Sequence, residues 1–350
     1  MTLPSQKPPT SAEVARQAAV SRTTVSFVLN GVLNRGISEA TRERVLAVAR
    51  SMGYQPNAAA RSLASGQTGT VGVVIPKAAH LYVDAFLAQL VATVNEQCHA
   101  LGLKMLIETT DDEGREPGGF VNLVRGRSID GLIVANLRTS EHAHLDKITE
   151  AGIPLVVLTS RPRELPHLAT VLSDTAKAAC TAVQHLIKLG HQDIAFISFA
   201  QPEYESVHER ELGWQQALKQ ANLAVRRDLV EYADISAQSG YDAARRLLAR
   251  GVKFTALFAG NDTIAFGALR ALHEASLRVP QDVAVVGYDD IPMAAFATPP
   301  LTTMHSDPIG QAQMALKLLM AQINADTSAE PVQHEVSPQL LIRASCGALT

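Results

Sequence analysis

Residues 10–31 read TSAEVARQAAVSRTTVSFVLNG, a pattern typical of two short helices joined by a tight turn. Thr10 can cap the first helix, because Glu13 follows three residues later, as a capping box requires. Apolar residues recur on one face of each expected helix: Val14, Ala15 and Ala18 on the first, and Val25, Val28 and Leu29 on the second. The two helices are therefore expected to pack against each other.

The second helix directs polar, basic and aromatic side chains outward: Arg22, Thr23, Ser26, Phe27 and Asn30. A helix that displays such residues, supported by another across a turn, is how a helix-turn-helix enters the major groove. We add the neighbouring hydroxyls of Thr10, Ser21 and Thr24 to the predicted DNA-contacting residues. The alternative is an ordinary helical hairpin packed on a larger domain, because such short patterns also arise by chance.

Charge is divided unevenly along the 350 residues, although the net charge is only −3. Residues 1–66 contain eight Lys or Arg and three acidic residues, whereas the remainder contains 23 basic and 31 acidic residues. A basic N-terminal part on an acidic body is typical of a protein whose first part alone meets phosphates. This distribution favours the DNA-binding interpretation.

A third helix is expected over residues 39–51, with Ser38 as its cap and Gly53 just beyond its end. Residues 56–64, PNAAARSLA, favour one or two further helical turns, which are too short to be stable alone. We therefore expect this segment to fold only when it is held by a partner. The Ser- and Gly-containing run over residues 65–69 predicts a domain boundary.

From residue 71 onward, apolar strands alternate with helices. Seven strands are expected: 71–75, 104–108, 131–135, 154–158, 194–198, 256–259 and 283–287. Helices are expected between them, such as 86–100, 176–189, 209–221, 241–249 and 263–275. Near-continuous apolar strands separated by helices indicate parallel sheets covered on both faces, and this length favours two doubly wound lobes. Ligands of such sheets bind at the carboxyl ends of the strands.

The remaining composition limits the class of protein. The three cysteines, Cys98, Cys180 and Cys346, have no metal or redox spacing, which fits a reducing cytoplasm. No apolar run is long enough for a membrane span, and the polar, Pro-containing residues 1–9 predict a flexible leader rather than a signal peptide. Neither a cofactor nor a metal site is expected. Walker, dinucleotide, nucleophile-elbow and zinc-protease motifs are absent, which disfavours an enzyme.

The order of these parts resembles the lactose–galactose repressor family over nearly the whole chain. In the first part the matching residues are Val14-Ala15, Val20-Ser21, Thr24-Val25-Ser26, Val28-Leu29-Asn30-Gly31 and Gly53-Tyr54-Gln55-Pro56-Asn57. In the second part they are Asp130-Gly131-Leu132-Ile133, Gly152-Ile153-Pro154, Leu189-Gly190-His191, Asn261-Asp262 with Gly267, Val286-Gly287-Tyr288-Asp289-Asp290 and Pro300-Leu301-Thr302-Thr303.

The resemblance implies a helix-turn-helix head, a hinge helix, and an α/β core shaped like a type I periplasmic sugar-binding protein. The expected domains are a head over residues 10–55, a hinge helix and linker over 56–70, and a core over 71–350. Within the core, the first lobe is expected over 71–170 plus 302–330, and the second over 171–301 plus 331–350. The resemblance also implies a homodimer that binds a palindromic operator in double-stranded DNA.

On the head, the family's base-reading positions fall on Arg22, Thr23 and Phe27. Arg22 would contact either a guanine or a phosphate, and Phe27 would touch a thymine methyl group or pack against Val32. Phe27 stands where the family usually has Arg, and Ala19 replaces the usual turn glycine. By the same resemblance, Leu63 would wedge between base pairs or else pack on the core. Asn57, Ala60 and Arg61 lie where hinge residues face the minor groove.

In the core, the family's ligand contacts match Arg210, Asn261 and Asp289. Together they suit a polyhydroxylated effector such as a sugar, although an ion pair and turn formation are the structural alternatives. Tyr82 and Phe86 are candidates for stacking on a ring, and Asn136, Ser160 and Arg161 end strands on the expected cleft side. We expect Asp262 to cap a helix and Trp214 to lie in the core. Asp174 matches a family position near the lobe crossover and is a candidate for a structural role.

The sequence thus predicts a cytoplasmic, sequence-specific transcriptional regulator, a repressor, controlled by a small effector. The alternative is a solute-binding protein for sugar transport, which would share the core fold. That alternative predicts a signal peptide and no basic head, and the sequence disagrees with both.

Overall fold

The structure, a computed structural model, describes residues 9–32, 35–55, 62, 66–77, 80–110, 120–126, 128–136, 138–158, 168–324 and 332–348. The chain divides into two compact units, residues 1–68 and 69–350, which we call the head and the core. Several residues singled out from the sequence lie outside the described residues: Asn57, Ala60, Arg61, Leu63, Ser160 and Arg161.

The head contains three helices, α1 (Ser11–Gln17), α2 (Arg22–Leu29) and α3 (Glu39–Ser51). The capping box predicted at α1 is confirmed: the Thr10 hydroxyl accepts from the Glu13 amide, and Glu13 accepts from the Thr10 amide at 2.7 Å. Ser21 and Ser38 cap α2 and α3 through their hydroxyls, which accept from the Thr24 and Thr41 amides. Each helix begins where a short hydroxyl side chain satisfies an amide that would otherwise lack a partner.

Small apolar side chains hold the three helices together. The buried cluster consists of Val14, Ala15, Ala18, Val25, Val28, Val45 and Ala49. Ala19, in the turn between α1 and α2, has φ +53°, in the left-handed region that favours glycine. The Arg44 Nε on α3 donates to the Ala18 carbonyl at 3.0 Å, which ties the third helix to this turn.

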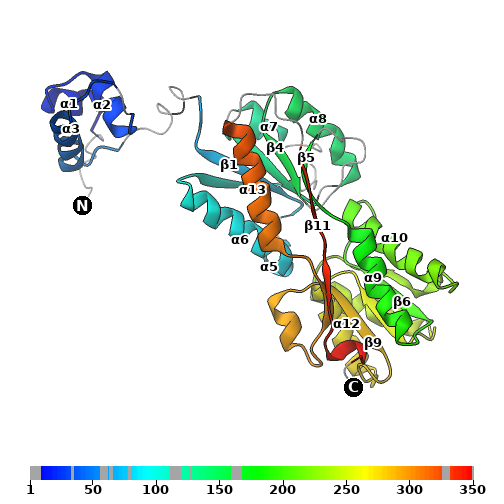
Figure 1. The fold of residues 1–350 in the computed structure, drawn as a ribbon. Coiled ribbons are helices and arrows are strands. Elements are labelled where there is room, and N and C mark those ends of the chain that lie inside the picture. Colours follow the sequence, from blue (N-terminus) through cyan, green and yellow to red (C-terminus); the bar gives the residue numbers. More distant parts are fainter. Residues whose placement is uncertain are drawn as a thin grey trace, which may run out of the picture. The chain divides into compact units, whose positions relative to one another are not determined.

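The core contains two lobes, each built on a six-stranded sheet (Figure 1). The first sheet has the order β11-β5-β4-β3-β1-β2, and all its pairs are parallel. Its strands are β1 (Thr70–Ile75), β2 (Lys104–Thr109), β3 (Gly131–Ala135), β4 (Leu155–Leu158), β5 (Ala169–Ser173) and β11 (Gln333–Val336). Its helices are α5 (His80–Val83), α6 (Ala85–Ala100), α7 (Val121–Arg125), α8 (His142–Glu150) and α13 (Pro308–Asn324), with the short helix η1 (Thr139–Glu141). Helices α6 and α13 lie side by side over one face, and α7 and α8 cover the other.

The second sheet has the order β12-β10-β9-β8-β6-β7, with β12 antiparallel to β10. Its strands are β6 (Ile194–Ser198), β7 (Val230–Tyr232), β8 (Ala256–Ala259), β9 (Ala284–Asp289), β10 (Thr302–His305) and β12 (Gln339–Leu341). Its helices are α9 (Thr175–Lys188), α10 (Glu205–Gln220), α11 (Ala237–Ala249) and α12 (Asp262–Glu274), with the short helices η2 (Arg227–Leu229), η3 (Pro292–Phe296) and η4 (Ala344–Cys346). Helices α9 and α10 pack on one face, and α11 and α12 on the other.

Close packing of these helix pairs depends on glycine. A Cβ at Gly213 on α10 would lie 2.2 Å from the Ala176 carbonyl oxygen of α9. A Cβ at Gly267 on α12 would lie 2.0 Å from the Ala237 carbonyl oxygen of α11. Both helix pairs therefore approach to a distance that only a hydrogen at this position permits.

The structure differs from the expected lobe bounds in three places. Strand β10 lies in the second sheet although residues 302–330 were expected in the first lobe, and β11 lies in the first sheet although residues 331–350 were expected in the second. Strand β5 belongs wholly to the first sheet, beyond the expected limit at residue 170. The described residues cross between the lobes after β5, after β10 and between β11 and β12. The sequence pattern contains no signal for the crossings after β10 and between β11 and β12, because these strands are short.

No described helix is long and apolar enough to cross a membrane.

Candidate functional site

The outer face of α2 exposes polar and basic side chains. Arg22, Thr23 and Ser26 are exposed, and Arg22 makes no hydrogen bond or ion pair within the described residues. Asn30, at the C-terminal end of the helix, donates to the Ser26 hydroxyl at 3.2 Å. A basic residue at the start of such a helix, without an internal partner, is placed as a groove-reading residue has to be.

Three other predicted DNA contacts have structural roles in the head. Thr10 and Ser21 use their hydroxyls to cap α1 and α2, and Thr24 shares a 2.9 Å hydrogen bond with Ser21. Phe27 is half-buried, and the Arg35 guanidinium lies over its ring, 5.2 Å from the centroid. Phe27 therefore holds Arg35 beside α2, a cation–π contact that the sequence did not suggest.

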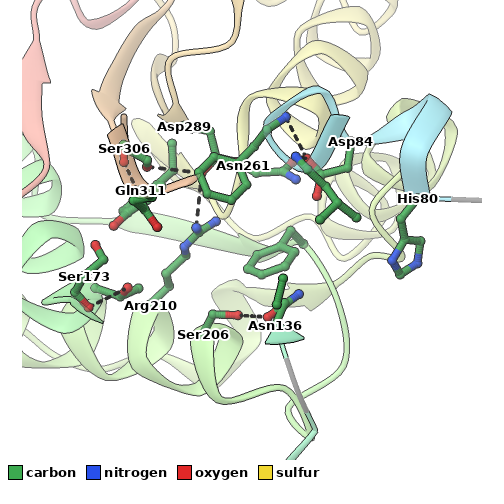
Figure 2. A pocket seen from close by; sticks show the side chains of 16 residues that line it. His80, Asp84, Asn136, Ser173, Ser206, Arg210, Asn261, Asp289, Ser306 and Gln311 are labelled. Carbon is green, nitrogen blue, oxygen red and sulfur yellow. Dashed lines mark hydrogen bonds and ion pairs between the residues drawn. The ribbon is translucent and has the colours of Figure 1, made fainter. Parts of the chain in front are cut away.

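The core contains a pocket between its two lobes (Figure 2). The first lobe contributes His80, Asp84, Phe86, Leu87, Ala135, Asn136, Ser173 and Gln311. The second lobe and the crossing segments contribute Thr175, Phe199, Ser206, Arg210, Asn261, Tyr288, Asp289 and Ser306. The pocket thus lies where carboxyl ends of strands in both sheets meet, as expected for doubly wound lobes.

Arg210 is the central cation of the pocket and is only 8% exposed. One terminal nitrogen donates to Asp289 Oδ1 at 3.2 Å, and the other donates to the Gly260 carbonyl. Its guanidinium carbon lies 3.8 Å from the Tyr288 ring centroid and 4.5 Å from that of Phe199. The ion pair of Arg210 is therefore buried and not at the surface, and its guanidinium lies against two aromatic rings.

Asp289 and Asn261 are held rigidly at the ends of their strands. Burial raises the pKa of Asp289 well above its usual range, and the neighbouring charge of Arg210 opposes that rise. Asn261 is the N-cap of α12, since its side-chain oxygen accepts from the Ile264 amide at 2.8 Å. Asn261 also lines the pocket, so one residue combines helix capping with pocket lining.

Asp262 does not cap the helix, contrary to our expectation. It is the first residue of α12 and is completely buried, accepting from the Thr303 hydroxyl at 2.6 Å and the Ile291 amide at 2.9 Å. Burial raises its pKa to about 7. The neighbouring Asn261 takes the cap because its extended backbone lies one residue ahead of the helix. Asp262 instead joins α12 to the segments that follow β9 and form β10.

On the first lobe, Asp84 is a pocket residue that the sequence analysis missed. It caps α6 by accepting from the Phe86 and Leu87 amides at 3.0 and 3.3 Å, both at Oδ1. Burial raises its pKa, and the Arg210 charge opposes this. Asn136, a predicted residue with φ +52°, lines the pocket and accepts from the Ser206 hydroxyl at 2.6 Å, which joins the two lobes.

Tyr82 is not a pocket residue, and its predicted stacking role is wrong. Its side chain is 81% exposed. His80, two positions earlier in the short helix α5, is buried and lines the pocket instead. Residues two apart on a helix point to nearly opposite sides, so only one of the pair can face the ligand. Phe86, the other stacking candidate, does line the pocket.

Two further expectations are confirmed by burial and bonding. Trp214 is fully buried in the second lobe, stacks on Phe196 with ring centroids 5.9 Å apart, and donates to the Ile194 carbonyl. Asp174, which stands at the crossover between lobes, accepts from the Lys177 amide and caps α9. Both residues have structural roles, and neither lines the pocket.

Two buried polar atoms of the pocket, Arg210 Nε and Gln311 Oε1, have no hydrogen-bond partner among the described residues. The Tyr288 hydroxyl interacts with the side chains of Ser173 and Thr175 in the pocket wall. Buried polar groups in folded proteins nearly always have a partner, so the two exceptions indicate a place for a ligand or for water. They offer one donor and one acceptor, which is the pattern that hydroxyl groups satisfy.

A helix-turn-helix on one unit and a polar pocket between two lobes on the other define a DNA-binding protein that responds to a small molecule. Residues 10–57 match the family described as bacterial regulatory proteins, lacI family, and residues 183–346 match the periplasmic binding protein-like domain. The chain is 33% identical over 336 residues to the HTH-type transcriptional repressor PurR of Actinobacillus pleuropneumoniae serotype 3 (strain JL03), covering 95% of this chain and 97% of that protein.

Two solved structures extend the likeness to the whole fold. The lac repressor dimer bound to operator and the anti-inducer ONPF has a TM-score of 0.84 at 27% identity, covering 97% of this chain and 99% of the other. The complex of the transcriptional regulator CelR with cellobiose has a TM-score of 0.71 at 32% identity, covering 96% and 99%.

The chain therefore belongs to the lacI family of bacterial regulatory proteins. It is a DNA-binding transcriptional regulator with an effector-binding core, and not an enzyme. A transport protein, the alternative that shares the core fold, is not favoured, because the relatives match the head as well as the core.

Proposed function

We propose that this protein is a cytoplasmic repressor that binds a palindromic operator as a homodimer. Its affinity for the operator would fall or rise when a sugar-like effector binds in the core pocket. Arg22, Thr23 and Phe27 would meet base edges in the major groove. Thr10, Ser21, Thr24, Ser26 and Asn30 would position the head on the phosphates.

The hinge part of the proposal rests on the residues over 56–70. Leu63 would enter the minor groove and bend the duplex, while Asn57, Ala60 and Arg61 would face the groove beside it. Two such segments would fold together only when both heads occupy one operator. Folding of the hinge would therefore be linked to DNA binding.

For the effector, we propose direct contacts with Arg210, Asn261 and Asp289 from one lobe and with Phe86, Asn136 and Arg161 from the other. The observation that supports this most strongly is the pair of unsatisfied buried polar atoms, Arg210 Nε and Gln311 Oε1, in the pocket between the lobes. CelR, whose structure contains cellobiose, is a relative whose ligand belongs to the same chemical class.

Effector control would work through the closure of the lobes. The Asn136–Ser206 hydrogen bond spans the two lobes, so a ligand that changes their spacing also changes this contact. An effector changes operator affinity only to the extent that it binds the open and the closed arrangement of the lobes with different affinities. Couplings of about 1–3 kcal/mol would change operator affinity roughly 5–150-fold.

The test begins with selection of operator sequences from random double-stranded oligonucleotides by the full-length protein. A thermal-shift screen of sugars, sugar acids and sugar phosphates then identifies effectors, and operator affinity is measured with each compound that binds. We expect one selected sequence and at least one compound that changes its affinity by fivefold or more. Failure to select any sequence, with or without cell extract, would refute the proposal.

Two variants address the roles on the head and the hinge. Arg22→Ala should weaken binding to the selected operator far more than binding to unrelated DNA, whereas Arg50→Ala on the exposed side of α3 should not discriminate between the two. Leu63→Ala should likewise lose specific binding preferentially. An equal loss on both kinds of DNA would contradict the assigned roles.

A further inference from the structure

The pocket contains a second carboxylate, Asp84, which faces the pair formed by Arg210 and Asp289 from the opposite lobe (Figure 2). We infer that the effector is a polyhydroxylated compound that carries a protonated amine, and that Asp84 binds the ammonium group. This inference rests on the proposed function, since it names the chemical class of the same effector.

Among the described residues that line the pocket, carboxylates outnumber Arg and Lys side chains. Arg210 is its only Arg or Lys among the described residues, and Asp84 and Asp289 are its carboxylates. The Arg210 charge is already used by Asp289, by the Gly260 carbonyl and by the faces of two aromatic rings. Asp84 itself has no ion pair among the described residues, so its carboxylate is the one that a cationic group of a ligand can meet.

Asp84 has an oxygen available for a ligand. Its Oδ1 accepts both amide hydrogen bonds at the start of α6, and its Oδ2 has no hydrogen bond within the described residues. The carboxylate also occupies the positive end of the sixteen-residue helix α6, the position that would otherwise attract a phosphate or carboxylate of a ligand. This end of α6 is therefore not available to an anion.

The electrostatic surroundings support the same conclusion. Burial raises the pKa of Asp84, and the Asp84 charge in turn contributes to the raised pKa of Asp289. The two carboxylates thus repel each other within one poorly solvated space. An ammonium group would relieve this repulsion, whereas a sugar phosphate or sugar acid would add a third negative charge.

Hydroxyl groups of the same ligand would satisfy the remaining polar atoms. Arg210 Nε can donate and Gln311 Oε1 can accept. Both side chains are more than nine-tenths buried and line the pocket. A ligand with several hydroxyls and one amine therefore matches both the unsatisfied atoms and the Asp84 carboxylate.

The test compares three forms of each of three sugars by calorimetric titration of the full-length protein. Glucose, galactose and mannose are each offered as the neutral sugar, the 2-amino sugar and the 6-phosphate. For at least one scaffold we expect the amino form to have a Kd roughly 10–100-fold below that of the neutral form, as a charge-assisted hydrogen bond provides. The phosphate should bind more weakly than the neutral form.

Asp84→Asn removes the charge but keeps an oxygen that can cap α6, so the variant should fold. In this variant the ratio of the Kd values for the neutral and amino forms should fall to near one. Asp242→Asn, the same substitution on the exposed side of α11, should leave the ratio unchanged.

Three results would overturn the inference: no binding of any amino form, an amino form no tighter than its neutral counterpart, or an amine preference that survives in Asp84→Asn. A neutral or phosphorylated sugar that binds more tightly than every amino form and alters operator affinity would also overturn it, while leaving the proposed function intact. Absence of any selected operator would instead refute the proposed function.

Discussion

Replacing Arg210 by Met tests the buried ion pair on which the pocket depends. Met fills much of the same space but has no charge, so Asp289 is left without its 3.2 Å partner. The Arg210 and Asp289 side chains are only 10% and 5% exposed, so water cannot replace the lost contact. Leaving one member of a buried pair alone costs about 3–5 kcal/mol of unfolding free energy.

The size of this loss should depend on pH. Burial already raises the pKa of Asp289, and removal of the Arg210 charge should raise it further. Between the unfolded pKa of about 4 and the raised folded value, the folded variant holds a proton that the unfolded chain has released. Its stability therefore falls as pH rises, by up to about 1.4 kcal/mol per pH unit. The deficit should be small near pH 5 and largest near pH 8.

Trp214 provides the measurement, because it is the only tryptophan and lies fully buried in the second lobe. Urea unfolding followed by its fluorescence, at pH 5 and pH 8, gives the free energy for each variant. Adding Asp289→Asn to Arg210→Met removes the stranded charge and should recover most of the loss at pH 8.

Arg278→Met serves as the control, because Arg278 is 71% exposed in its pair with Asp282 and such surface pairs contribute at most about 1 kcal/mol. The reasoning is refuted if Arg210→Met leaves the midpoint at pH 8 unchanged, or if the double variant is no more stable than the single one. Both Arg210 variants should also lose the thermal stabilisation produced by the effector.

Three shorter predictions concern other parts of the chain. Ala19→Gly should stabilise the head by about 1 kcal/mol, because glycine adopts φ +53° without the steric strain that alanine has there. Amide hydrogen exchange in the head should then become slower, and an unchanged exchange rate would argue against this. Gly213→Ala should destabilise the core by about 1–3 kcal/mol in the urea assay, since its Cβ would collide with the Ala176 carbonyl, and an unchanged midpoint would count against that packing. Asp262 has its pKa raised to about 7, so wild-type stability should fall as pH rises from 4 to 7. Asp262→Asn, whose amide oxygen can still accept from the Thr303 hydroxyl, should reduce that slope, and an equal slope would contradict this.

The helices of the head were predictable from local chemistry alone. A short hydroxyl residue precedes each helix, and apolar side chains recur at helical spacing behind it, so the expected helix over 39–51 is the observed α3. The positive φ of Ala19 could be anticipated only from the family pattern, because alanine itself gives no turn signal. The helix caps and the apolar spacing depend on neighbours within four residues, so the sequence alone predicts them.

The core shows where such reasoning stops. All seven expected strands are present, but twelve strands lie among the described residues. The strands that were missed are β5, β7, β10, β11 and β12, which have at most five residues. Both β11 and β12 are edge strands with partly exposed residues, so they lack a long apolar run.

The candidate site divides in the same way. Asp289 ends an apolar strand and Asn261 comes soon after another, so their position at the carboxyl edge was predictable. Ser173 ends a strand that was missed, Ser306 follows another such strand, and Asp84 faces them only because the two lobes meet. No local pattern encodes how two separately formed sheets approach each other.

The late return of the chain to the first lobe affects how the protein is made. Strand β5 is paired on its outer side by β11, which is synthesised about 160 residues later, after the second sheet has received all its strands except β12. Until residue 336 has left the ribosome, the edge of the first sheet at β5 has no neighbouring strand. For most of that time α13 is also missing, so the face of the sheet that it covers is exposed. Nascent chains stalled or truncated before that point should therefore be the species that bind chaperones and aggregate, whereas the head can already be folded.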